Sequence, residues 1–61
     1  MEEHGKVGGR IRTYRERLGM STADLSAKSG IDEKVIESVE RGEVLPALGA
    51  LTKISRALGQ R

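Results

Sequence analysis

The side chains that could do chemistry in this chain are charged or hydroxyl-bearing, and catalysis is the chemistry they fit least. The chain has no cysteine, and its one histidine, His4, lies in a polar N-terminal stretch. No aspartate or glutamate pair has an evident reason for the raised pKa that acid–base catalysis uses. The GKVGG segment lacks the spacing of a phosphate-binding loop. We therefore expect a binding domain with no enzymatic activity, metal site or cofactor.

Candidate binding residues gather in one segment, residues 21–42, STADLSAKSGIDEKVIESVERG. Ser21 is a good N-cap, and Asp24 three residues later completes a variant of the capping box. Gly30 fits the sharp turn after a first short helix, and Asp32 can cap a second one. Two short helices joined in this way are typical of a helix-turn-helix, which presents its second helix to the major groove. Double-stranded DNA is therefore the first partner that we expect.

Four amphipathic helices account for the apolar pattern, so the sequence predicts an all-α fold. A flexible polar tail of residues 1–6 is followed by helices at about 7–18, 22–29, 33–41 and 47–58. Pro46 fits the start of the fourth helix. Gly8 and Gly9 each weaken the first helix by about 1 kcal/mol relative to alanine if they lie inside it. The side chains expected in the core are Val7, Ile11, Tyr14, Leu18, Leu25, Ile31, Val35, Ile36, Val39, Leu48, Leu51, Ile54 and Leu58.

Length and charge narrow the class of protein. A chain of 61 residues has room for one small domain. Its net charge of +2 permits nucleic-acid binding without demanding it. No apolar run is long enough to span a membrane, and the N-terminus lacks the pattern of a secretory signal. We expect a soluble, cytoplasmic protein.

The pattern GGRIRTYRERLGMSTADLSAKSGIDEKVIESVERG…LPALGALTKISRALG resembles the DNA-binding domain of the Cro and phage-repressor family of bacterial regulators. It is similar in particular to repressors of developmental or biofilm genes, and to regulators in which this domain precedes a cupin sensor. The resemblance covers about residues 7–59 without gaps. It implies a compact lambda-repressor-like domain of four to five helices over residues 7–61, with the helix-turn-helix at about 22–41. The chain stops where a fifth helix usually begins.

The resemblance also implies a function and a role for matching positions. The expected function is that of a sequence-specific DNA-binding module of a transcriptional repressor, working as half of a homodimer on an operator with two half-sites. Thr22 occupies a position that commonly binds phosphate and buttresses the recognition helix. Glu33, Lys34 and Ser38 match positions that reach base edges, where such side chains contact cytosine N4 or guanine O6 and N7. The full set expected at the DNA is Ser21, Thr22, Asp32, Glu33, Lys34, Glu37, Ser38 and Arg41, with phosphate contacts by Arg10 and Lys28.

Structural roles explain some of the same residues. Asp32 and Glu33 also fit a helix cap and a charge that complements the helix dipole, which any helix start favours. Arg15 and Glu40 match the family's partly buried ion pair between the first and third helices. We expect that pair to hold the fold together and not to contact DNA.

A second function uses the loop after the third helix. Glu43, Val44 and Leu45 stand where relatives often carry basic residues that grip the phosphate backbone. This loop and the acidic start of the third helix would suit a domain that has lost DNA affinity and binds a protein partner, because exposed apolar patches often mark such surfaces. Leu45 also fits a role in fixing the fourth helix to the core.

Overall fold

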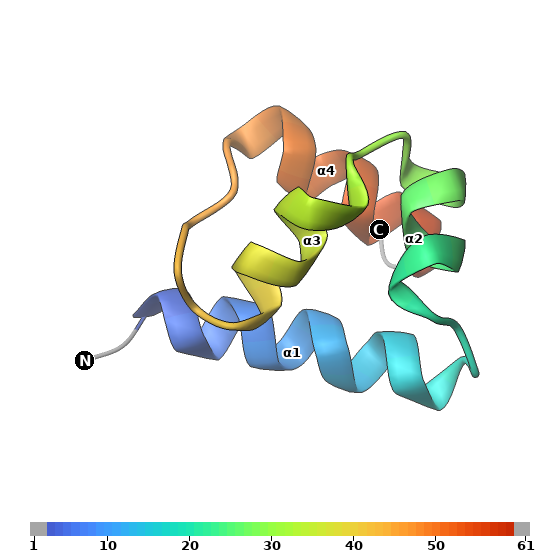
Figure 1. Cartoon of the computed structure of the whole chain (residues 1–61), viewed down its shortest axis with the longest axis horizontal. Coiled ribbons are helices and arrows are strands. Elements are labelled where there is room, and N and C mark those ends of the chain that lie inside the picture. Colours follow the sequence, from blue (N-terminus) through green and yellow to red (C-terminus); the bar gives the residue numbers. More distant parts are fainter. Residues whose placement is uncertain (1–2, 60–61) are drawn as a thin grey trace.

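The computed structural model describes residues 3–59, with side chains from residue 6 onward, and these residues form four helices and no strand. The helices are α1 (Glu3–Arg17), α2 (Thr22–Ser29), α3 (Glu33–Glu40) and α4 (Leu48–Ala57). α1 runs along one edge of the molecule, and the three shorter helices all lie on the same side of α1 (Figure 1). The all-α fold expected from the sequence is confirmed.

The helix boundaries agree with the sequence pattern except at the N-terminus. α2 has the predicted bounds, and α3 and α4 differ only by residues that cap them, such as Arg41 after α3. α1 begins at Glu3, so residues 3–6, expected in a flexible tail, are helical. These residues carry no large apolar side chain, and hydrophobic periodicity cannot detect a helix there. Residues 1–2 of the expected tail and residues 60–61 of the expected domain lie outside the described part.

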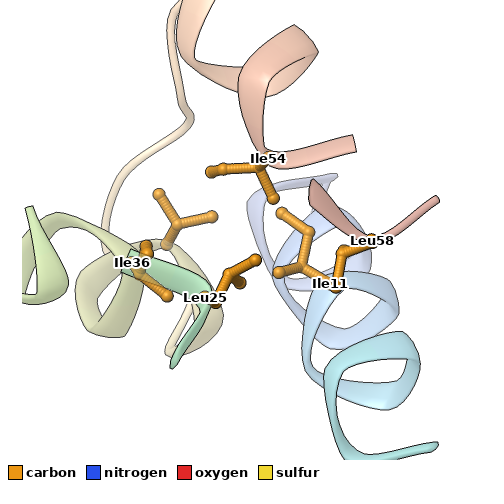
Figure 2. Packing of buried hydrophobic residues seen from close by; sticks show 6 residues of the cluster. Ile11, Leu25, Ile36, Ile54 and Leu58 are labelled. Carbon is orange, nitrogen blue, oxygen red and sulfur yellow. The ribbon is translucent and has the colours of Figure 1, made fainter. Parts of the chain in front are cut away.

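All four helices, with the residue that caps α4, contribute to one apolar core (Figure 2). Leu25, Ile36, Val39 and Ile54 have no exposed surface. Burying an aliphatic side chain of this size stabilises the fold by roughly 1.5 to 3 kcal/mol. Partly buried residues packed around this cluster are Val7, Met20, Ile31, Leu51 and Ala57.

Four apolar side chains expected in the core are exposed instead. Leu48 is 80% exposed because it is the first residue of α4. Leu18 follows the last residue of α1, and Val35 lies at the margin of a helix that has only two turns. Tyr14 is 37% exposed and lines a groove between α1 and α4. A helical wheel shows which side of a helix is apolar. It does not show how far the neighbouring helices cover that side.

Gly8 allows α1 to lie directly against the end of α3. A Cβ atom at Gly8 would overlap the carbonyl oxygen of Val39 and lie 3.0 Å from the Cα of Glu40. A Cβ atom at Gly9 would meet nothing within 4 Å. The sequence suggested that both glycines only weaken the helix, whereas the structure gives Gly8 a packing role.

Candidate nucleic-acid interface

The turn between α2 and α3 is closed by local hydrogen bonds. Gly30 adopts the left-handed conformation, with φ at 76°, which favours glycine. The hydroxyl of Ser26 donates to the carbonyl oxygen of Ile31 over 2.6 Å, and the Ile31 amide donates to the Ser29 hydroxyl over 3.2 Å. The Asp32 carboxylate then accepts from the Lys34 amide over 3.1 Å, which caps α3. The sequence allowed two roles for Asp32, a helix cap and a DNA contact. The structure shows Asp32 as the cap of α3.

The start of α2 carries the complete capping box. The Ser21 hydroxyl accepts from the Asp24 amide, and the Asp24 carboxylate accepts from the Ser21 amide, each over 3.0 Å. The hydrogen bond from the Ser21 backbone, followed by that from its side chain, lowers the pKa of Asp24. Two amides at the helix start are thereby satisfied, and the orientation of α2 is fixed where it meets the preceding loop.

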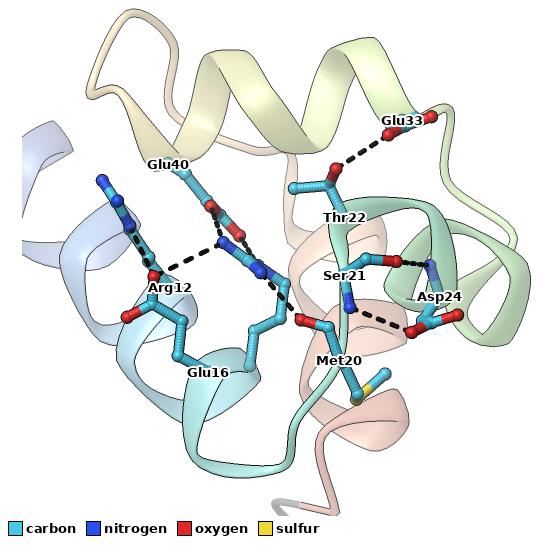
Figure 3. A network of polar contacts seen from close by, with 9 residues as sticks. Arg12, Glu16, Met20, Ser21, Thr22, Asp24, Glu33 and Glu40 are labelled. Atoms are coloured by element: carbon cyan, nitrogen blue, oxygen red, sulfur yellow. Dashed lines mark hydrogen bonds and ion pairs between the residues drawn. The ribbon is translucent and has the colours of Figure 1, made fainter.

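Thr22 and Glu33 are joined to each other. The Thr22 hydroxyl donates to the Glu33 carboxylate over 2.7 Å in a partly buried contact, so the first residue of α2 holds the first residue of α3 (Figure 3). The sequence suggested separate roles for them, at a phosphate and at a base edge. The hydrogen bond between them cannot be predicted from their spacing in the sequence, because it depends on the angle between the two helices. This hydrogen bond orients the Glu33 carboxylate and ties the first turn of α3 to the start of α2.

The outer side of α3 presents a mixed set of polar groups. Lys34 and Arg41 are exposed, and Glu37 and Ser38 between them are partly buried. Arg41 pairs with the exposed Glu43 over 3.1 Å. Lys34 has no carboxylate partner among the side chains of residues 6–59. The structure therefore brings together most of the predicted base-contact set, in which the charge of Lys34 is not balanced by any carboxylate of residues 6–59.

An ion pair fixes the other end of α3. Arg15 on α1 donates two hydrogen bonds to the Glu40 carboxylate, over 2.7 and 2.9 Å, and a third to the carbonyl oxygen of Met20 over 2.8 Å (Figure 3). The side chains are only 12% and 7% exposed. The hydrogen bond to Glu40 raises the pKa of Arg15, while burial acts in the opposite direction. The pair expected between the first and third helices is present, and it also holds the loop that leads into α2.

The remaining predicted contact residues lie farther from this surface or on its border. Lys28 is exposed in the last turn of α2. Arg10 lies on the opposite side of α1 from Gly8 and lines the groove between α1 and α4, so the structure does not bring it to the α3 surface. Val44 and Leu45 are exposed in the loop that joins α3 to α4. Leu45 is 53% exposed, so it does not act as a buried staple for α4.

The described residues offer neither a metal-binding cluster nor a membrane-spanning helix. No group of three or more histidine, cysteine, aspartate or glutamate residues there could hold a metal ion. None of the helices within residues 3–59 has the length and apolar character that crossing a membrane needs.

Comparisons with known proteins agree with this geometry. The family model of the helix-turn-helix matches residues 11–61. An uncharacterised HTH-type transcriptional regulator, y4dL of Sinorhizobium fredii, is 44% identical over 48 residues, which cover 79% of this chain and 24% of that protein. An uncharacterised HTH-type regulator of Methanothermobacter thermautotrophicus is 34% identical, over 82% of this chain and 72% of that protein.

The transcriptional regulator SinR of Bacillus subtilis is 34% identical over 53 residues, which cover 85% of this chain and 48% of SinR. This chain therefore spans about half of SinR and a quarter of y4dL. No solved structure gave a significant match. With the family match over most of its length and the motif formed by α2 and α3, the chain belongs to the helix-turn-helix family of Cro and phage-repressor type.

Proposed function

We propose that this chain is the sequence-specific DNA-binding domain of a transcriptional regulator and that α3 enters the major groove. The observation that carries the proposal is the way α3 is held. Thr22 fixes its first residue, Arg15 fixes its last, and its apolar side is buried in the core. An α-helix with its side chains is about 10 to 12 Å across, which suits a major groove about 12 Å wide.

The charges of α3 favour base contacts over phosphate contacts. The Glu33 carboxylate, oriented by Thr22, is an acceptor suited to cytosine N4. Lys34 is a donor suited to guanine O6 or N7. The net charge of +2 leaves little positive charge for neutralising phosphates. We therefore expect a half-site with G·C pairs opposite the start of α3 and a shallower salt dependence than basic DNA-binding domains show.

Selection from a random duplex library, followed by anisotropy titration, tests this function. Each good base contact is worth roughly 1 to 3 kcal/mol, so Lys34→Ala should weaken binding to the selected duplex by roughly 5- to 150-fold. Lys53→Ala is the matched control, because Lys53 is exposed on α4 and its loss changes the net charge equally. Equal affinity for selected and random duplexes would contradict the sequence-specific part of the proposal.

Thr22→Val tests the tie between the two helices. Valine keeps the shape of threonine but cannot donate to the Glu33 carboxylate. We expect the variant to fold and to lose discrimination at the base pair next to Glu33. Unchanged discrimination would remove this contact from the recognition mechanism.

We also propose that the full-length regulator binds as a symmetric homodimer, as members of this family do, and represses transcription. The two half-sites would then lie about 34 to 36 Å apart, one turn of the double helix. Footprinting with the full-length protein checks the spacing.

A second candidate function is an interaction module that uses the loop of Glu43, Val44 and Leu45. The exposure of the two apolar side chains favours it, but membership of a DNA-binding family favours DNA. NMR titration separates the two functions. Shifts on α3 with duplex DNA support the first function, and shifts confined to the loop with a protein partner support the second.

A further inference from the structure

The chain leaves α3 through a turn of fixed shape. Arg41 is the residue after α3, and Gly42 adopts the left-handed conformation, with φ at 77°. The Gly42 amide donates to the carbonyl oxygen of Val39 over 3.0 Å, and the Glu43 amide donates to that of Ser38 over 2.9 Å. These two hydrogen bonds form the Schellman motif, which ends many helices. The backbone of Glu43 is therefore fixed relative to α3.

The side chains of Arg41 and Glu43 meet over this turn. Nε of Arg41 donates to the Glu43 carboxylate over 3.1 Å, and the two side chains are 59% and 57% exposed. A carboxylate bound at Nε does not use the two terminal NH2 groups of the guanidinium, which together can bind two phosphate oxygens. Glu43 therefore orients the guanidinium through a nitrogen that a phosphate bound at the terminal NH2 groups does not need.

Stability does not account for this pair. An ion pair between two exposed side chains contributes little to the free energy of unfolding. A carboxylate at the C-terminal end of a helix also meets the negative end of the helix dipole, which disfavours it. The pair has a physical basis in binding instead, because an arginine that is already held loses less rotamer freedom when an anion binds it.

Arg41 lies at the border of the surface that α3 presents. It follows Lys34 by seven residues, so the two side chains lie on the same side of the helix, about 10 Å apart along its axis. When a helix-turn-helix binds DNA, the N-terminal residues of the second helix contact base edges. With Lys34 at the base edges, Arg41 lies two turns away from them. The position of Arg41 therefore favours a phosphate beside the groove over a base.

We propose that Glu43 is a positioning residue, which holds the Arg41 guanidinium so that its terminal NH2 groups bind one phosphate of the duplex. The inference rests on the proposed function, because it needs a duplex on α3. The Glu43 carboxylate also repels phosphates, but salt screens this repulsion over about 8 Å at physiological ionic strength. The gain from holding Arg41 exceeds the repulsion, so Glu43 strengthens DNA binding although its charge is negative.

Two variants of equal charge separate positioning from repulsion. Glu43→Gln keeps an oxygen that can accept from Nε of Arg41, whereas Glu43→Ala has none. In anisotropy titrations at physiological salt, we expect Glu43→Ala to bind the selected duplex roughly threefold more weakly than Glu43→Gln, and more weakly than the wild type. Tighter binding by Glu43→Ala than by the wild type, or equal binding by the two variants, would overturn the proposal.

The effect of Glu43 must pass through Arg41. In an Arg41→Ala background, Glu43→Ala should no longer weaken binding, because no guanidinium remains to be held. An undiminished loss in that background would overturn the positioning role. Both side chains are exposed, so thermal unfolding of Glu43→Ala should match that of the wild type, which separates binding from folding.

A duplex of random sequence distinguishes a phosphate from a base pair. Every sequence offers the same phosphates, so Glu43→Ala should weaken binding to the selected and the random duplex by the same factor. A loss confined to the selected duplex would assign Arg41 to a base pair and overturn the proposal. If the wild type binds neither duplex, the proposed function fails and this inference with it, whereas the other contrary outcomes overturn the inference alone.

Discussion

Replacing Gly8 by alanine tests the packing of α1 against α3 more sharply than any change in the core. Gly8→Ala adds one methyl group, which would overlap the carbonyl oxygen of Val39. That oxygen belongs to the backbone and cannot rotate aside, so α1 and α3 must separate. Gly9→Ala is the matched control, because a Cβ atom there meets nothing within 4 Å.

The magnitude follows from comparing these two neighbours. Alanine is favoured over glycine inside a helix by roughly 0.5 to 1 kcal/mol, and both positions lie inside α1. Gly9→Ala should therefore stabilise the domain by about that amount. Overpacking costs roughly 1 to 3 kcal/mol, and the helix gain cancels between the two variants. Gly8→Ala should be less stable than Gly9→Ala by roughly 1 to 3 kcal/mol.

Thermal unfolding followed by circular dichroism at 222 nm measures the difference. For a domain of this size, about 1 kcal/mol shifts Tm by roughly 4 to 8 °C, so the two variants should differ by at least about 4 °C. If Gly8→Ala is as stable as Gly9→Ala, the close approach of α1 to α3 is wrong. The position of α3 would then need another explanation.

Three further perturbations test the supports of the motif. Arg15→Ala should cost roughly 3 to 5 kcal/mol in urea unfolding, and more than Glu40→Ala, because it strands a nearly buried carboxylate and the Met20 carbonyl; equal costs would refute this assignment. Because folding lowers the pKa of Asp24, this carboxylate binds a proton at higher pH in the unfolded chain than in the folded one. The stabilisation that the Asp24 carboxylate gives is therefore complete above about pH 4 and is lost as pH falls through the folded-state pKa. Urea unfolding at pH 5 and pH 3 should show a smaller loss for Asp24→Asn than for the wild type, and an equal loss would contradict the capping role. Gly30→Ala should destabilise by roughly 1 to 2 kcal/mol because its φ is positive; an unchanged Tm would show that the turn adopts another form.

Much of the fold follows from local signals in the sequence. Ser21 and Asp24 predict the start of α2, and the side chains of Leu25 and Ile36 lie in the core that periodicity assigns to them. Leu48 shows the limit of periodicity, because its exposure depends on where α4 begins.

The candidate site was less predictable than the fold. Types and spacing singled out the outer side of α3, but the contact between Thr22 and Glu33 joins residues eleven positions apart across two helices. The close approach at Gly8 likewise depends on how α1 and α3 cross. No pattern within a single helix encodes such distances, so these features appear only when the helices are packed together.

A combined protein and DNA substitution tests whether side chains of α3 distinguish base pairs. Affinities of the wild type and Lys34→Ala are measured for the selected duplex and for duplexes with one base pair replaced at a time. Each replaced pair in the site should cost the wild type roughly 1 to 3 kcal/mol. At the base pair that Lys34 contacts, the replacement should cost Lys34→Ala nothing further, while every other position keeps its cost. Full discrimination by Lys34→Ala at every position would show that Lys34 reads no base pair.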